Sequence, residues 1–399
     1  MTDSTTQKRY QVLKSSYDRD KAFVVGESTL SNRFTHEYLD NLANQCDAVT
    51  DPPGVFEFLN HTYLAVVEFC FHPDIYTYSF EIYFRLLEAV EWEPYLIATL
   101  VAIVFTIARY TCTFFFLRTV VGKKFATEQS QKKAITPLWN TISYAFLFTV
   151  EAFTLYFYGY NDFIYPLCIF KEIHFRHGYF DDPVPLHYYW LYMFQMGYYM
   201  HSFYATIRLD IRRKDTSVIL IHHVLTIALL SFSFFARLYR VGVLVLFLHD
   251  ISDVLLESGK FMVAARSKYP EHANILEYVA NCLFGAFVAS WFYLRIYLYP
   301  TKVIYGTTWG VYLTHLDREA YFFLFFNVML VALYFLHIYW SYFIVVMLLK
   351  KATGRMPKIE DEREFDSDSS LTPVKANGVH GGSPKAPATN GVHKRKKFQ

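Results

Sequence analysis

The stretch that decides the fold is residues 212–260, RRKDTSVILIHHVLTIALLSFSFFARLYRVGVLVLFLHDISDVLLESGK. It contains two apolar runs, Thr216–Ala236 and Val241–Leu256, which are separated by the short polar break 237–240. Membrane-spanning helices need about 20 predominantly apolar residues to cross a bilayer. We therefore predict two antiparallel membrane helices joined at this break, with the second helix beginning near Leu238.

Both runs carry ionisable residues, which are costly at membrane depth and indicate a functional site. These residues are His222 and His223 in the first run and His249, Asp250 and Asp253 in the second. His223 and Asp253 are equally far from Leu238 along the chain. Antiparallel helices would place them at the same depth, with His222 one residue away. The spacing predicts imidazoles and carboxylates that converge between the two helices.

The composition indicates a membrane protein. Of the 399 residues, 53% are hydrophobic and 20% are aromatic, which suits lipid contact and aromatic belts at the interfaces. The net charge is only +2, so we expect no nucleic-acid partner. Five cysteines without a CxxC pair indicate neither a zinc module nor a disulfide framework.

Seven apolar runs are long enough for membrane helices or nearly so. They are Tyr95–Leu117, Ala134–Tyr158, Val184–Ile207, Thr216–Ala236, Val241–Leu256, Ile275–Leu298 and Tyr321–Leu349. The predicted fold class is an all-α polytopic membrane protein with about seven transmembrane helices.

The orientation follows from the basic residues between these runs. Lys and Arg are concentrated after the first, third, fifth and seventh runs, which places those connections in the cytosol. The amino end is then lumenal, where Asn60 in the sequon Asn60-His61-Thr62 can be glycosylated. The carboxyl end is cytosolic, and its Lys396-Lys397 pair resembles a dilysine signal for retention in the endoplasmic reticulum.

The chemistry expected of the central helices is proton transfer or nucleophile activation. A carboxylate beside an imidazole fixes the tautomer and leaves the other ring nitrogen basic, or able to carry an acyl group. His222 would lie about 9 Å inside the cytosolic surface, at 1.5 Å per helical residue. Arg212, Arg213 and Lys214 at that mouth either hold a phosphorylated donor or act as ordinary positive-inside anchors.

The central residues also resemble a known family. The run RRKD–HH–LxLHDISDxLLExxK (212–260) looks like the Lag1 motif of the ceramide synthases, within the TLC-domain proteins. The likeness includes Gln195, Tyr199, Arg295 and LHIYW at 336–340, and covers roughly residues 123–349. It implies an endoplasmic reticulum enzyme that N-acylates sphingoid bases with fatty acyl-CoA to give dihydroceramide or ceramide. No cofactor is implied, since fatty acyl-CoA is a co-substrate.

The resemblance also implies residue roles. His222 would be the acyl acceptor or general base, Asp253 would orient and stabilise it, and His223 and Asp250 would be supporting polar groups. The loop 299–320 would be linked to the choice of acyl length. The connection 118–133 is too short for the homeobox-like domain of many animal members, so the chain resembles the subgroup that lacks it.

The domain organisation and partners follow from these observations. We expect a lumenal segment (1–94), a first transmembrane helix with the start of a short cytosolic loop (95–122), a TLC-type catalytic membrane domain (123–350) and a disordered cytosolic tail (351–399). The expected partners are the membrane, fatty acyl-CoA and a sphingoid base, with a homo- or heterodimer left open.

Three other functions stay open on the sequence alone. One is a non-catalytic TLC-type lipid sensor or translocation helper, and another is a proton-coupled transporter. A third is a di-iron membrane hydroxylase, which would need several histidine boxes. The chain offers one HxxH pair, His174–His177, on the expected lumenal side, so we predict no metal site.

Overall fold

The computed structural model describes residues 52–71, 84, 87–88, 90–116, 128–170, 183–314 and 322–355, and within these ranges the regular structure is entirely helical. The helices are α3 (Val55–Phe71), α5 (Trp92–Phe116), α6 (Glu128–Tyr158), α7 (Tyr160–Ile164), η2 (Pro166–Cys168), α8 (Leu186–Arg208), α9 (Thr216–Phe235), α10 (Tyr239–Arg266), η4 (Pro270–His272), α11 (Ala273–Ser290), η5 (Trp291–Ile304), η6 (Gly306–Gly310), α12 (Val311–Thr314) and α13 (Phe323–Ala352). Most of the 1–94 segment, the pair His174–His177 and the tail with Lys396-Lys397 lie outside the described residues.

Each of the seven predicted apolar runs coincides with a long helix. α5, α9, the continuous helix Pro270–Gly310 and α13 are long and apolar enough to cross a membrane by length and composition. The remaining runs form α6, α8 and α10, which carry more polar or tyrosine-rich sequence. The prediction of an all-helical, multi-pass membrane protein is therefore confirmed.

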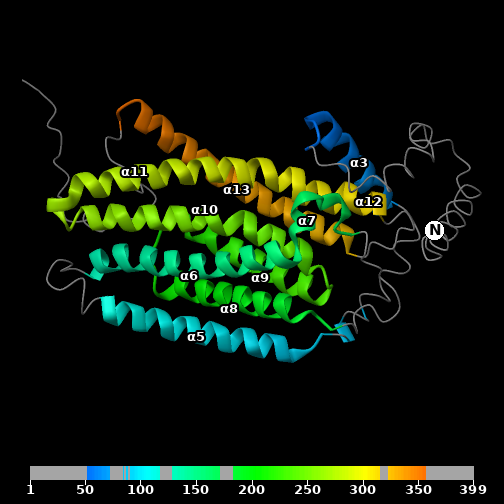
Figure 1. Ribbon diagram of the computed structural model, residues 1–399, viewed down its shortest axis with the longest axis horizontal. Coiled ribbons are helices and arrows are strands. Elements are labelled where there is room, and N and C mark those ends of the chain that lie inside the picture. Colours follow the sequence, from blue (N-terminus) through cyan, green and yellow to red (C-terminus); the bar gives the residue numbers. More distant parts are fainter. Residues whose placement is uncertain are drawn as a thin grey trace, which may run out of the picture. The chain divides into compact units, whose positions relative to one another are not determined.

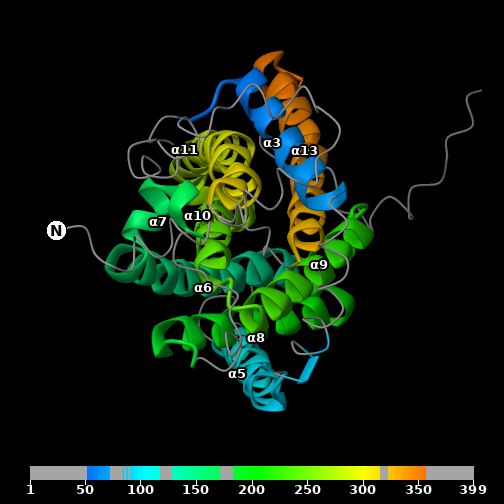
Figure 2. The same cartoon turned by 90° about the vertical axis from the view of Figure 1, so that its right-hand side faces the viewer.

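The long helices lie side by side in a bundle with α10 among its inner members (Figure 1). α10 packs against α6 and α11, while α8 lies between α5 and α9. In the end view, α5 lies at one edge beside α8, and α13 and α3 lie at the opposite edge (Figure 2). Residues from α9 and α10 contribute to both of the two largest apolar cores.

The predicted hairpin of α9 and α10 is present, with its break at residues 236–238. The backbone N–H of Leu238 donates to the carbonyl of Ser233 at 2.8 Å, and Arg237 takes a left-handed conformation with φ 59°. α10 begins at Tyr239, as expected, but it continues to Arg266 instead of ending at Leu256. The helix extends because Glu257 and Lys260 form an ion pair at 2.6 Å one turn apart, and no proline follows before Pro270.

The sixth helix also departs from the expectation, because most of the predicted loop 299–320 is helical. The chain winds as a π-helix over Trp291–Ile304 and again over Gly306–Gly310 before ending at Thr314. Pro300 lies inside this stretch and lacks the backbone N–H of an ordinary helical residue. Helical winding persists here because Trp309 and Tyr305 are buried against Leu167 of η2, together with α3 side chains.

Ion pairs between charged side chains connect helices at both ends of the bundle. Arg109 of α5 contacts Asp210, just after the end of α8, at 2.5 Å. At the other end, Arg240 of α10 forms an ion pair with Asp162 of α7. α3 docks at this second end, where His61 Nδ1 lies 2.7 Å from the Tyr305 hydroxyl and its ring stacks on Trp309 at 3.9 Å.

Candidate active site

The two adjacent histidines of α9 pack against α8 and α13 and differ in their partners. Nε2 of His223 lies 3.4 Å from Oγ of Ser202 and 3.3 Å from Oγ1 of Thr206, both on α8. His222 makes no side-chain hydrogen bond with any described residue, and its Nδ1 is buried without a partner. A buried polar atom without a partner costs free energy, so an uncommitted imidazole here indicates a functional group.

The expected contact between His222 and Asp253 is not present, which corrects the predicted imidazole–carboxylate pair. Asp253 instead binds Arg295 of η5 at 2.7 Å, and a second bond from Arg295 goes to the His249 carbonyl at 2.8 Å. The guanidinium lies over the Trp291 ring at 4.4 Å. A buried carboxylate is stabilised more by a fixed cation than by a neutral imidazole, and the π-helical stretch delivers that cation.

Asp250 faces a different neighbour from Asp253, although the two lie three residues apart on α10. Its side chain is fully buried and accepts a 3.1 Å hydrogen bond from Nε2 of Gln195 on α8. The same Nε2 also donates to Glu151 of α6. The acidic residues of α10 therefore lie on two sides of the helix, and Glu257 accepts a hydrogen bond from Asn140 of α6 at 3.4 Å.

His249 pairs with the imidazole of His337, for which the sequence indicated no role. Its Nε2 lies 2.8 Å from Nε2 of His337 on α13, while its Nδ1 donates to the Val245 carbonyl at 2.5 Å. The two rings are buried. Within the described ranges, no three His, Cys, Asp or Glu side chains are grouped as a metal site requires.

Aromatic rings join these groups into one cluster. Tyr199 of α8 packs against both His222 and His223, with ring centroids 6.3 and 6.0 Å apart. Trp340 of α13 meets His222 edge-on at 5.4 Å and lies 6.5 Å from Trp291, the ring beneath Arg295. The structure thus gathers His222, His223, Asp250 and Asp253 into one buried site, although His222 and Asp253 are not directly bonded.

The predicted donor-binding residues lie between α8 and α9. Arg212 and Lys214 are exposed, whereas Arg213 is partly buried and its Nε lies 3.3 Å from Oδ1 of Asp215. Arg213 therefore helps to fix the start of α9, and Arg212 and Lys214 expose their side chains on the same connection. Asn60 of the sequon is exposed on α3.

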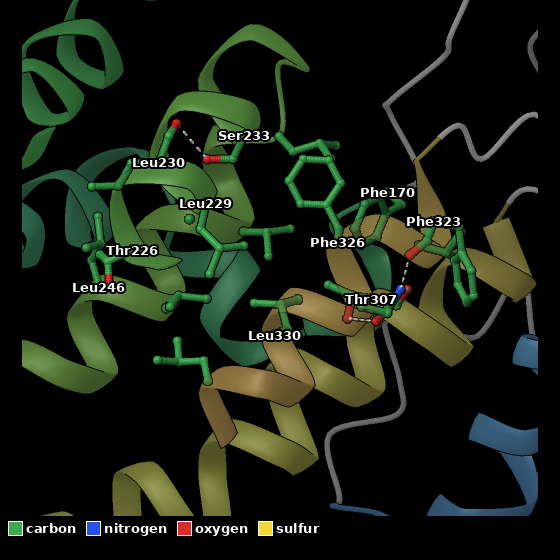
Figure 3. A pocket seen from close by; sticks show the side chains of 17 residues that line it. Phe170, Thr226, Leu229, Leu230, Ser233, Leu246, Thr307, Phe323, Phe326 and Leu330 are labelled. Atoms are coloured by element: carbon green, nitrogen blue, oxygen red, sulfur yellow. Dashed lines mark hydrogen bonds between the residues drawn. The ribbon is translucent and has the colours of Figure 1, made fainter. Parts of the chain in front are cut away.

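An apolar cavity extends from the cluster towards the α9–α10 turn, and Figure 3 shows side chains that line it. It begins at Thr226, one helical turn from His222, and at Leu333, one turn from His337. From there it extends to Phe323 and Phe326 near the start of α13. Its walls come from α9, α10, the Thr307–Val311 stretch and α13.

The few polar side chains in this cavity are already satisfied. Thr226 and Ser233 donate to carbonyls of their own helix, His222 and Leu230, at 2.8 and 3.2 Å. Thr307 donates to Oδ1 of Asn327 at 2.8 Å, and this contact lies at the far end of the cavity (Figure 3). The cavity therefore offers its occupant an apolar surface, which suits a hydrocarbon chain.

The sequence pattern did not identify several residues of the site, or gave no indication of their role. Glu151 is the one acidic residue of the run 134–158, and that isolation was the available signal. His337 and Trp340 lie in the quoted LHIYW stretch, yet apolar periodicity cannot show which face of α13 is inward. Gln195 and Arg295 were indicated only by the resemblance to the ceramide synthase family.

The geometry therefore defines a class of protein. It is an all-helical membrane protein with a buried cluster of His, Asp and Arg side chains beside an apolar cavity. Comparison with protein families matches residues 138–346 to the TLC domain. The chain belongs to this TLC-domain family.

Similar curated proteins include ceramide synthases of animals and plants. Ceramide synthase 1 of Homo sapiens is 37% identical over 234 residues, 55% of this chain and 64% of the relative. Ceramide synthase 1 of Mus musculus is 33% identical over 58% of this chain and 67% of the relative. Ceramide synthase LOH2 of Arabidopsis thaliana is 35% identical over 48% of this chain and 63% of the relative. The chain thus spans about two thirds of the length of these relatives.

Proposed function

We propose that this protein is a sphingosine N-acyltransferase, which joins a fatty acyl group from acyl-CoA to the amine of a sphingoid base. The observation that carries the proposal is the uncommitted imidazole of His222 one helical turn from an apolar cavity. The similarity to ceramide synthases of animals and plants supports the substrate class. No cofactor is required, because the thioester of acyl-CoA supplies the activated acyl group.

His222 is the proposed acyl acceptor or general base. As acceptor, a ring nitrogen attacks the thioester carbonyl, the C–S bond breaks and CoA leaves as thiolate; the sphingoid amine then displaces the imidazole. As base, the imidazole takes a proton from the attacking amine. Both roles need a ring nitrogen free of internal partners. Nδ1 of each histidine meets this condition, but the His223 ring is held at Nε2 by Ser202 and Thr206, whereas the His222 side chain has no hydrogen bond with a described residue.

Asp253 acts in this proposal through Arg295. It holds the guanidinium in place, and the guanidinium contributes a fixed positive charge to the buried cluster. Fixed charges in a water-poor site stabilise developing negative charge without reorganisation, as the carbonyl oxygen acquires during acyl transfer. His223 and Asp250 remain supporting groups.

The cavity is the proposed site of the acyl chain. It begins one turn from His222 and is apolar to its far end at the Thr307–Asn327 contact. A chain laid along it would place its carboxyl end beside the imidazole and exclude water from the thioester. The exposed cations Arg212 and Lys214 are proposed to attract the phosphates of CoA.

We also propose seven spans in the endoplasmic reticulum membrane, with the amino end lumenal and the carboxyl end cytosolic. Basic residues support this orientation, and so does the exposure of Asn60 at the end opposite Arg212. The turn between α9 and α10 then lies on the lumenal side. The site is reached from the cytosol by acyl-CoA and from the bilayer by the sphingoid base.

The test is acyl transfer to sphinganine by the purified protein, with a panel of acyl-CoAs. We expect turnover by wild type and a loss of at least about 100-fold in His222→Ala, since removing a nucleophile or base abolishes its step. Ile221→Ala, an exposed neighbour on α9, is the matched control and should retain activity. Mass spectrometry of His222 after exposure to acyl-CoA alone distinguishes acceptor from base.

Two results would contradict the proposal. Wild-type protein that binds acyl-CoA without transferring the acyl group would favour a non-catalytic lipid sensor or translocation helper. Normal turnover by His222→Ala would remove His222 from the reaction while leaving the enzyme class intact.

A further inference from the structure

Glu151 is a buried carboxyl group that the proposed reaction leaves unused. It lies in the 134–158 part of α6, where it is the one acidic residue, and has no solvent exposure. Its Oε2 is buried without a hydrogen-bond partner. Among the described residues, no Lys or Arg forms an ion pair with Glu151 or with Asp250. A buried anion without a cation is expensive, so this position calls for a chemical reason.

The partners of Glu151 place it against Asp250. Nε2 of Gln195 donates to Oε1 of Glu151 and, at 3.1 Å, to Oδ2 of Asp250. Because one nitrogen donates to an oxygen of each, the two carboxyl groups lie side by side. A hydrogen bond between two carboxyl groups requires a proton on one of them, because two carboxylates are both acceptors.

The charges nearby do not offset a second negative charge at this point. Arg295 is bound to Asp253 and to the His249 carbonyl. Two carboxylates that touch in a site of low dielectric repel each other strongly, and such pairs hold one proton between them. The titratable and charged groups that surround the pair are Tyr144 of α6, Tyr198 and Tyr199 of α8, Asp253 of α10 and Arg295 of η5.

The pair is connected to His222 through α8. Gln195 and Tyr199 lie four residues apart on that helix and so share a face. Gln195 holds the carboxyl pair, and Tyr199 packs against His222. A substrate amine that approaches an acyl carbon at His222 is therefore within the same buried cluster as the pair.

We propose that Glu151 and Asp250 share one proton and act together as the proton acceptor for the ammonium group of the sphingoid base. This inference rests on the proposed N-acyltransferase function. Asp250 meets the substrate, and Glu151 is a positioning residue that acts through it.

The proton balance of this step is complete. The ammonium gives one proton to the singly protonated pair, which becomes neutral with two protons, and the substrate becomes a free amine. The amine nitrogen forms the new C–N bond, and the bond from the acyl carbon to CoA sulfur or to His222 breaks. The second amine proton goes to that leaving group, and the pair returns its extra proton to water after product release.

The test compares Glu151→Gln with wild type in acyl transfer from acyl-CoA to sphinganine across pH 6.5–9. We expect kcat to fall at least tenfold near neutral pH with an unchanged KM for acyl-CoA. The deficit should shrink as pH rises, because more of the sphingoid base then arrives already deprotonated. Glu151→Asp retains a carboxyl group and should recover part of kcat. Thr154→Val is the matched control on α6, since its hydroxyl bonds only its own helix.

The outcomes separate this inference from the proposed function. An active wild type with an unaffected Glu151→Gln, or with a deficit that does not change with pH, overturns the role of Glu151 alone. A wild type without acyl transfer overturns the proposed function itself. If Glu151→Gln does not fold, the pH profile of Glu151→Asp decides: a deficit that shrinks with pH supports the proposal, and a flat or absent deficit refutes it.

Discussion

The two halves of the α9–α10 hairpin differ sharply in what they bury. The half away from the turn holds His222, His223, Asp250 and Asp253, whose neighbours supply imidazole, guanidinium and carboxyl groups. The half near the turn lines an apolar cavity whose polar side chains are all bonded internally. One pair of helices therefore contributes both a cluster of polar, reactive side chains and an apolar pocket that suits a lipid chain.

The difference shows how each half is stabilised. The polar half depends on specific pairs, because a charge left without its partner in the bundle is costly. The apolar half depends on shape, because van der Waals contact drives packing between membrane helices. Substitutions in the first half should therefore affect both folding and chemistry, whereas those in the second should affect chain selection or packing.

The largest expected effect follows from Arg295→Met. This change removes the cation of Asp253 and the donor to the His249 carbonyl while keeping a long side chain. We expect a loss of about 3–5 kcal/mol of stability, as for other broken buried ion pairs, together with loss of acyl transfer. Thermal unfolding in detergent and turnover are the measurements.

A double substitution sharpens this prediction. Asp253→Asn added to Arg295→Met removes both charges, so the double variant should be more stable than the sum of the single effects implies. Additive losses would show that the pair does not contribute as an ion pair, and the contrast between the two halves would weaken.

The sequence predicted the parts of the fold that depend on periodicity and length. The hairpin break near Leu238 and all seven apolar runs have counterparts in the structure. It did not predict the extension of α10 to Arg266, because that segment is polar and the Glu257–Lys260 pair stabilises it without apolar periodicity. It also did not predict the helical winding after residue 298, because that depends on tertiary contacts of aromatic side chains.

The site was only partly accessible from the sequence for a related reason. Equal distance from the turn placed His222 and Asp253 at one depth, but depth does not fix which way a side chain points. Arg295 comes from a distant helix and takes Asp253 as its partner. Glu151 lies on another helix again, so no spacing within 212–260 could show its contact with Gln195.

A smaller effect is expected from Gly242→Ala, at the boundary of the two halves. A Cβ at Gly242 would lie 1.9 Å from the Tyr192 hydroxyl, which is buried and 3.0 Å from Oγ of Ser233. The tyrosine must move, so we expect about 1–3 kcal/mol of destabilisation by overpacking. Gly285→Ala, which meets nothing within 4 Å, is the control and should be neutral or stabilising in thermal unfolding. Equal melting temperatures for the two variants would refute the close contact.

The smallest effect should be confined to substrate choice, in Leu330→Phe. Leu330 is 4% exposed and lines the cavity from α13, so a larger ring shortens the space for an acyl chain. We expect the ratio of kcat/KM for long over shorter acyl-CoAs to fall about tenfold, the scale of a few methylenes in an apolar pocket. Leu324→Phe makes the same change on the exposed face of α13, where the side chain is 50% exposed, and should leave the ratio unchanged. A uniform loss of kcat/KM for all chain lengths, or the same shift of the ratio in both variants, would show that the cavity does not hold the acyl chain. In that case the half of the hairpin near the turn would not select the acyl chain.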